Sequence, residues 1–188
     1  MPPEPRTQPR YDHNRKNTNH QRSNALNVKF IGNSLLQHID TRIGGMNVEN
    51  IKAMTIRDCK MQCEKITKDT DVVVCQSITN DVKHLSESSC VEAMLDLVDT
   101  FKLKHPHTKL LISMPPPTRN NLNIKIQNVN TLLKVKLKDK VDIVENYESF
   151  LGPRGPKYHL YDDDVHLSDE GLRLLVSNIK RKCGRVCA

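Results

Sequence analysis

Near the middle of the chain stands the run Asp71-Val72-Val73-Val74-Cys75-Gln76. It lacks the alternation of apolar and polar residues that marks a strand with one face in water. An uninterrupted β-branched run is typical of a parallel strand that is buried on both faces. We therefore expect residues 71–76 to form the central strand of a parallel sheet.

Strands and helices alternate on both sides of this run. Apolar segments predict further strands at residues 28–31, 48–54, 109–114 and 141–144. Apolar residues at three-to-four spacing predict helices at 55–67, 89–104, 121–137 and 168–182, after a short helix or turn at 34–40. Such alternation produces right-handed crossovers. The predicted fold is a three-layer α/β/α sandwich with a five-stranded parallel sheet, of the flavodoxin-like type.

The net charge of +7 is concentrated at the two ends of the 188-residue chain. Residues 1–25 carry +3 and residues 178–188 carry +4, so the body between them is neutral. The first segment is rich in Pro, Arg, Asn and Gln, and we expect a disordered basic arm. We predict one domain at 26–183 and a basic tail at 184–188. Nucleic acid would contact the termini if it is a partner; the alternative is that the termini only aid solubility.

The composition is that of a soluble globular protein, with 37% hydrophobic and 27% charged residues. No stretch approaches the roughly 18 consecutive apolar residues of a membrane helix, and residues 1–6 contain no apolar run for a signal peptide. We expect an intracellular, cytoplasmic protein without membrane insertion. Reduced thiols are the default there, and the spacing predicts no zinc site for Cys59, Cys63, Cys75, Cys90, Cys183 and Cys187.

Three polar clusters lie at or near predicted strand ends, where parallel sheets gather functional groups. Ser34 follows the first strand, Asn80 follows the central strand, and Asp163 and His166 precede the last helix. A serine, an amide and an Asp/His pair are the parts of an acyl-transfer site. Ser34 would be the nucleophile, His166 the general base, Asp163 the group that orients the imidazole, and Asn80 an oxyanion donor.

Each cluster also has a purely structural interpretation. Ser34 would serve equally well as a helix cap. Asn80 and Asp81 are suited to an Asx turn. The acidic run at residues 162–164 is typical of a solvated loop.

Over residues 27–182 the sequence resembles the SGNH hydrolases, also called GDSL-like esterases. Gly32-Asn33-Ser34-Leu35 is similar to the Gly-Asp-Ser-Leu block, Asn80 lies in the block that carries the oxyanion asparagine, and residues 163–166 match the Asp-x-x-His block. The resemblance implies an ester hydrolase without cofactor or metal that cleaves a short-chain acyl or acetyl ester in a small-molecule or acylated substrate. It implies the triad Ser34, His166 and Asp163.

The resemblance also implies the accessory residues of the site. The oxyanion hole would combine the Asn80 side chain with the backbone N–H groups of Ser34 and Ala53, and Asn33 would contact substrate. Arg119, after the proline triplet at 115–117, is a further candidate for substrate binding.

Two positions depart from the family pattern. Ile78 and Ala53 stand where the family has glycine, and a β-branched residue crowds a turn that glycine leaves open. The competing hypothesis is therefore a catalytically degenerate module that acts as a scaffold or binds nucleic acid through its termini. A binder of carbohydrate or lipid that reuses the cleft is a third alternative.

Within the superfamily, residues 53–58 and 164–171 are similar to the esterase domains of LINE-type retrotransposon first open reading frames. This similarity implies an esterase core flanked by nucleic-acid-binding arms, which agrees with the neutral body and basic ends of the chain.

Overall fold

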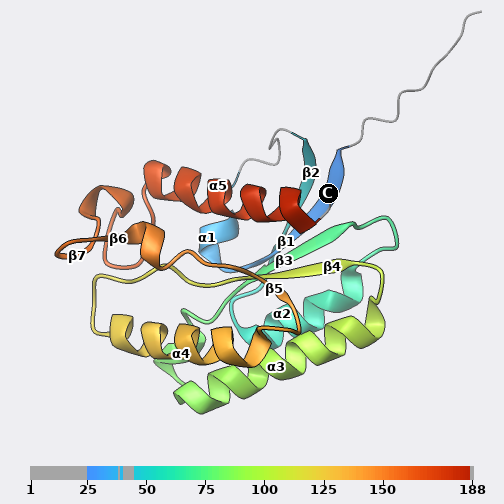
Figure 1. The fold of residues 1–188 in the computed structure, drawn as a ribbon, viewed down its shortest axis with the longest axis horizontal. Coiled ribbons are helices and arrows are strands. Elements are labelled where there is room, and N and C mark those ends of the chain that lie inside the picture. The colour runs from blue at the N-terminus through green and yellow to red at the C-terminus, as the bar shows by residue number, and fades with distance from the viewer. Residues whose placement is uncertain (1–24, 38, 40–44, 187–188) are drawn as a thin grey trace, which may run out of the picture.

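Five parallel strands form one sheet in the order β2-β1-β3-β4-β5 in the computed structural model (Figure 1). The central strand is β3, which pairs with β1 on one side and β4 on the other. All five residues of β3 are buried, as the sequence predicts. The strand bounds are β1 Leu26–Gly32, β2 Met46–Lys52, β3 Val72–Gln76, β4 Lys109–Ser113 and β5 Asp142–Val144.

The structure describes residues 25–37, 39 and 45–186. The predicted basic arm at 1–25 lies outside them except for its last residue. So do Cys187, residue 188, and residues 38 and 40 of the helix or turn predicted at 34–40. These expectations stay predictions.

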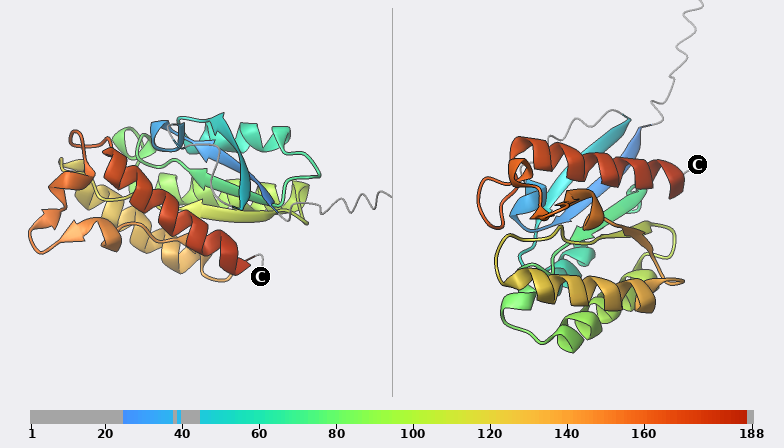
Figure 2. Two further views of the ribbon diagram at one scale, coloured as in Figure 1. Left: turned by 90° about the horizontal axis from the view of Figure 1, so that it is seen from above. Right: turned by 60° about the vertical axis from the view of Figure 1, so that its left-hand side comes forward.

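Helices cover both faces of the sheet and complete the three layers (Figures 1 and 2). Three of them pack on one face and two on the other, as the two separate core clusters show. The first group is α2 Ile56–Gln62, α3 Glu87–Lys104 and α4 Leu122–Leu137, and the second is α1 Ser34–Gln37 and α5 Asp169–Val186.

Successive residues of β3 supply these two cores in turn. Val73 and Cys75 pack in the α2–α4 cluster, whereas Val72 and Val74 pack in the cluster under α1 and α5. Neighbouring side chains of a strand point to opposite faces, so a sheet covered on both faces buries every residue of its central strand. This is the physical reason for the uninterrupted apolar run.

A capping box fixes the start of α2. The Thr55 side chain accepts a hydrogen bond from the Asp58 N–H, and the Asp58 carboxylate accepts one from the Thr55 N–H. Two of the N–H groups at this helix end are thereby satisfied. The helix ends at Gln62 and continues as a 3₁₀ turn, Cys63–Lys65.

The last helix, α5, is longer than the sequence predicts. It continues to Val186, past the boundary that we placed at residue 183. Cys183 is fully buried, and the Lys182 ammonium lies 2.8 Å from the Asp142 carboxylate. Residues 182 and 183 thus contact the folded body, and the helix continues three residues beyond them.

Shorter elements connect the main ones. A hairpin of β6 Leu151–Gly152 and β7 Gly155–Pro156 projects between β5 and α5. The 3₁₀ turns are η2 Asp81–Lys83, η3 Glu148–Phe150 and η4 Tyr158–Leu160. Over the ranges that the structure describes, no helix is long and apolar enough to cross a membrane.

Gly171 allows the first turn of α5 to pack against η4. A Cβ atom at this position would overlap the carbonyl oxygen of Leu160. We expect Gly171→Ala to destabilise the protein by about 3 kcal/mol, the upper part of the range for overpacked sites. Urea unfolding measures the change.

Gly184 is the matched control, because it lies in the same helix and a Cβ there would meet no atom within 4 Å. Gly184→Ala should stabilise the protein by about 0.5–1 kcal/mol through helix propensity. Equal effects of the two substitutions would contradict the close packing of Gly171.

Candidate active site

A cavity of about 290 Å³ lies at the carboxyl edge of the sheet. The ends of β1 and β3 and the loop before α5 meet there, which brings together Ser34, Asn80 and His166. The described residues that line it are Asn33, Ser34, Leu35, Met54, Thr79, Asn80, Lys83, Val165 and His166. Four of the predicted site residues therefore share one cavity.

The end of β1 places Ser34 at the start of α1. The Asn33 N–H donates to the Gln76 carbonyl at 3.2 Å, which ties the end of β1 to the end of β3. The Asn33 side-chain oxygen accepts a hydrogen bond from the Leu35 N–H at 3.1 Å. Asn33 thus provides the side-chain cap that the sequence also allowed for Ser34, and Ser34 lies half-buried at the cavity.

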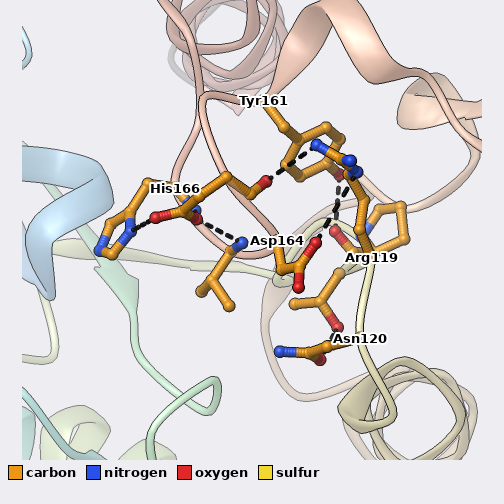
Figure 3. Close-up of polar contacts among 9 residues, drawn as sticks. Arg119, Asn120, Tyr161, Asp164 and His166 are labelled. Carbon is orange, nitrogen blue, oxygen red and sulfur yellow. Dashed lines mark hydrogen bonds and ion pairs between the residues drawn. The ribbon is translucent and has the colours of Figure 1, made fainter.

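The Asp163 carboxylate holds His166. Its Oδ2 lies 2.6 Å from His166 Nδ1, and its Oδ1 accepts the backbone N–H groups of Val165 and His166, each at 2.7 Å (Figure 3). These backbone and side-chain hydrogen bonds from His166 and Val165 lower the pKa of Asp163 well below its usual range. A carboxylate on Nδ1 leaves Nε2 as the ring nitrogen for the cavity.

The loop that carries this pair is closed at its base. The Asp162 N–H donates to the His166 carbonyl at 3.0 Å, and Tyr161 and Leu167 form an antiparallel bridge. Figure 3 shows His166 and Arg119 on two sides of this loop. The acidic run at 162–164 is therefore an ordered loop, although its carboxylates are exposed to solvent.

The Asn80 amide is held at both of its polar atoms. Its Nδ2 donates to the Met54 carbonyl at 3.0 Å, and its Oδ1 accepts from the Lys83 ammonium at 3.2 Å. Nδ2 carries two hydrogens, and the bond to Met54 uses one of them. The second N–H is the donor that this residue can offer to a bound group.

Ala53 is not part of the cavity. Its N–H donates to the Gly32 carbonyl at 2.8 Å, which continues the ladder between β1 and β2, and the residue is buried. This N–H is therefore already used, and we correct the oxyanion hole by removing Ala53. The next residue, Met54, reaches the cavity instead.

Ile78 adopts the backbone conformation that glycine favours, with φ of 75°. The Thr79 N–H donates across it to the Ser77 carbonyl at 2.9 Å, the hydrogen bond of a γ-turn. The side chain is fully buried in the α2–α4 core and is not among the residues that line the cavity. The crowding expected from a β-branched residue is accommodated by strain in the turn, and the side chain does not fill the site.

Asp81 supports this turn, a role that we did not predict. Its carboxylate accepts hydrogen bonds from the Ile78 N–H at 3.1 Å and from the Ile56 N–H at 3.2 Å. Burial raises the pKa of Asp81 although these hydrogen bonds oppose the rise. The sequence offered one signal, an acidic residue directly after Asn80, which we interpreted as an Asx turn.

Arg119 braces the Asp163–His166 loop and is not among the cavity residues. The backbone N–H of Arg119 donates to the Asp164 carbonyl at 2.8 Å. The guanidinium donates through Nη1 to the Asp163 carbonyl at 3.4 Å and lies 4.1 Å from the centre of the Tyr158 ring. The prediction that Arg119 contacts substrate thus has no support from this geometry. Its contacts make it a positioning residue for the loop.

Four of the described cysteines lie in the core between the sheet and helices α2–α4. Cys59, Cys63, Cys75 and Cys90 are buried thiols. Within the described parts of the chain, no three His, Cys, Asp or Glu side chains are grouped so that they could hold a metal ion.

Ile78→Gly separates the strain at this residue from its packing. Removing a buried isoleucine costs about 2–5 kcal/mol, whereas glycine relieves about 1–2 kcal/mol of left-handed strain. We expect a net loss of stability of about 1–3 kcal/mol, measured by urea unfolding.

Ile78→Ala is the control, because it loses nearly the same packing and keeps the strain. It should be about 1 kcal/mol less stable than Ile78→Gly. An alanine variant as stable as the glycine variant would contradict the strained turn.

Solved structures of known proteins share this architecture, whereas the sequence comparisons find no match. No family model matches the sequence, and no curated protein matches it. A GDSL-like lipase from Bacteroides thetaiotaomicron superimposes with a TM-score of 0.72 at 19% identity, covering 85% of this chain and 88% of the other. A carbohydrate esterase family 3 protein from Talaromyces cellulolyticus gives 0.66 at 16% identity, covering 86% and 97%. The chain has the α/β/α fold of the GDSL-like lipases and SGNH hydrolases, as predicted.

The esterase domain of the ZfL2-1 ORF1 protein, from a zebrafish retrotransposon, is 24% identical over 83% of this chain and 98% of its own. Its TM-score is 0.46, which is too low to support an argument. The retrotransposon relationship therefore stays a prediction.

Proposed function

We propose that this protein is a serine ester hydrolase of the SGNH type, with Ser34 as nucleophile, His166 as general base and Asp163 as the group that orients the base. The observation that carries the proposal is the single cavity shared by Ser34, Asn80 and His166, with His166 held by Asp163 at 2.6 Å. A nucleophile, a base and an orienting carboxylate are the parts that acyl transfer requires.

The reaction begins when Ser34 Oγ attacks the acyl carbon of the ester. His166 Nε2 takes the hydroxyl proton and then delivers it to the oxygen of the leaving alcohol as the ester bond breaks. Water attacks the acyl-serine in the second half, with His166 again accepting and returning a proton. Asp163 stays ionised and stabilises the imidazolium in both halves, which agrees with its lowered pKa.

The oxyanion of each tetrahedral intermediate would accept hydrogen bonds from the second N–H of Asn80 and from the backbone N–H of Ser34. The start of α1 adds little electrostatic support because this helix has only four residues. The Asn80 amide is consequently the principal donor in this proposal.

The size and lining of the cavity favour a short acyl group. At about 290 Å³ it is at the small end of the range for ligand sites, and Leu35, Met54 and Val165 supply an apolar surface. We propose an acetyl or other short-chain ester as substrate. One of the structures with the same fold is described as a carbohydrate esterase.

The test is steady-state hydrolysis of nitrophenyl acetate, butyrate and octanoate by the full chain. We expect kcat/KM to fall from the short esters to octanoate, because the longer chain exceeds the cavity. Equal and enzyme-independent hydrolysis of all three esters would overturn the proposal. A preference for octanoate would overturn the assignment of short-chain esters alone.

A further inference from the structure

The proposed oxyanion site lacks one of the donors that the sequence led us to expect. The Ala53 N–H is bonded to the Gly32 carbonyl, so Asn80 carries more of the stabilisation. Asn80 in turn has a charged neighbour, since the Lys83 ammonium donates to its Oδ1 at 3.2 Å. A hydrogen bond from a cation is stronger than one between neutral groups.

The position of Lys83 follows from the turn after β3. Lys83 is the last residue of η2, whose N-terminus is fixed because the Asp81 carboxylate accepts the N–H groups of Ile78 and Ile56. The backbone N–H of Lys83 also donates to the Asn80 carbonyl at 3.2 Å. Lysine and asparagine are thus linked by one backbone and one side-chain hydrogen bond.

Lys83 brings a positive charge to the cavity, while the buried Asp81 carboxylate of the same turn is engaged by the N–H groups of Ile78 and Ile56. Of the nine described residues that line the cavity, none is acidic and Lys83 is the only lysine or arginine. Asp163, the acidic residue of the proposed mechanism, is bonded to His166 Nδ1 and does not line the cavity. A positive charge in such a site interacts most favourably with the negative charge that develops in the transition state.

We propose that Lys83 is a positioning residue of the oxyanion site. Its ammonium fixes the orientation of the Asn80 amide, draws electron density toward Oδ1, and so makes the remaining Nδ2–H a stronger donor to the oxyanion. This inference rests on the proposed function. It assigns to Lys83 an effect on the transition state and none on ester binding.

The experiment compares kcat and KM for an acetyl ester in Lys83→Met, Lys83→Arg, Asn80→Ala and the double variant Lys83→Met/Asn80→Ala. We expect Lys83→Met to lower kcat on the order of 10-fold to 100-fold with KM nearly unchanged, less than the roughly 10²–10³-fold loss on removing a whole oxyanion donor. Lys83→Arg should recover most of kcat. The double variant should be no slower than Asn80→Ala, because Lys83 acts through that amide.

Lys68→Met is the matched control. Lys68 is exposed and precedes β3, so it lies at the opposite edge of the sheet. This variant should keep the kcat of the unmodified chain. Thermal unfolding of the three single lysine variants should be nearly unchanged, since Lys83 and Lys68 are exposed and exposed substitutions have small effects.

Three results would overturn the role of Lys83 in an active protein. The first is an unchanged kcat in Lys83→Met. The second is a raised KM in Lys83→Met with kcat unchanged. The third is a double variant whose kcat falls below that of Asn80→Ala by the same factor that Lys83→Met alone costs. A raised KM with unchanged kcat would instead indicate that Lys83 binds an anionic group of the substrate. If the unmodified chain neither hydrolyses esters nor reacts with a fluorophosphonate, the proposed function fails and the Lys83 inference fails with it.

Discussion

Ser34→Ala is expected to lower kcat for an acetyl ester by roughly 10⁴-fold to 10⁶-fold. The alanine variant keeps the cavity and loses the hydroxyl that forms the acyl intermediate. His166→Ala should have an effect of the same order, and the double variant should be no slower than the worse single variant, because the two residues act as one unit.

Ser88→Ala is the control for this pair of substitutions. Ser88 is an exposed serine in the first turn of α3, and it does not line the cavity. Its replacement should leave kcat unchanged. A kcat in Ser34→Ala close to that of Ser88→Ala would remove Ser34 from the mechanism.

Asp163→Asn is expected to lower kcat by about 10⁴-fold, the effect of replacing the orienting carboxylate in a serine hydrolase. An amide can still accept the backbone N–H groups of Val165 and His166, but it cannot stabilise an imidazolium as a carboxylate does. The loop should keep its shape, and the circular dichroism spectrum and thermal unfolding check that it does.

Asp164→Asn is the matched control, because it removes a neighbouring carboxylate from the same exposed loop. The Asp164 carboxylate lies 4.0 Å from the Arg119 guanidinium, whereas the His166 ring is bonded to Asp163. We expect it to change kcat by no more than a few-fold. Equal losses in the two variants would mean that loop charge, and not the Asp163–His166 contact, is what matters.

Because its pKa is lowered, Asp163 should not be the group that limits activity in mild acid. Hydrogen bonds from His166 and Val165 keep the Asp163 carboxylate ionised below its ordinary pKa of about 4. Its interactions are therefore present above about pH 4 and are lost only as the pH falls through the lowered value. A loss of kcat between pH 5 and 7 would therefore have to come from a group other than Asp163.

The sequence was sufficient to predict the three layers and the alternation of strands and helices along the chain. The run at residues 71–76 predicted a strand buried on both faces, since only helices on both sides of the sheet make such a run favourable, and β3 occupies 72–76 of it. The start of the helix predicted at 55–67 was also correct, and Thr55 caps it. The end of α5 was not, since three-to-four spacing weakens over the basic residues 180–182 while Cys183 remains buried.

The candidate site was predictable where side-chain chemistry alone suggests a role. In the structure, Ser34, Asn80 and His166 line one cavity, and the Asp163 carboxylate contacts His166. Ala53 was different, because whether a backbone N–H is available depends on which carbonyl it meets, here that of Gly32. Residue type carries no information about that pairing.

Arg119 and Ile78 show the same limit for side chains. An arginine in a loop is equally suited to an anionic substrate and to the backbone carbonyls of a neighbouring loop, and tertiary contacts decide in favour of the second. Ile78 adopts a left-handed backbone because Asp81 and the core compensate for the strain. A substitution that local preference argues against is thus tolerated through contacts formed by residues distant in sequence.

The most direct test of the central claim is labelling with a fluorophosphonate, which reacts covalently with an activated serine. Intact-mass and peptide analysis of the full chain should show one label, located on Ser34. The label should be absent in Ser34→Ala and form far more slowly in His166→Ala. A folded chain that takes no label, or takes it at another residue while Ser34 stays free, would contradict the assignment of Ser34 and His166 as a working nucleophile and base.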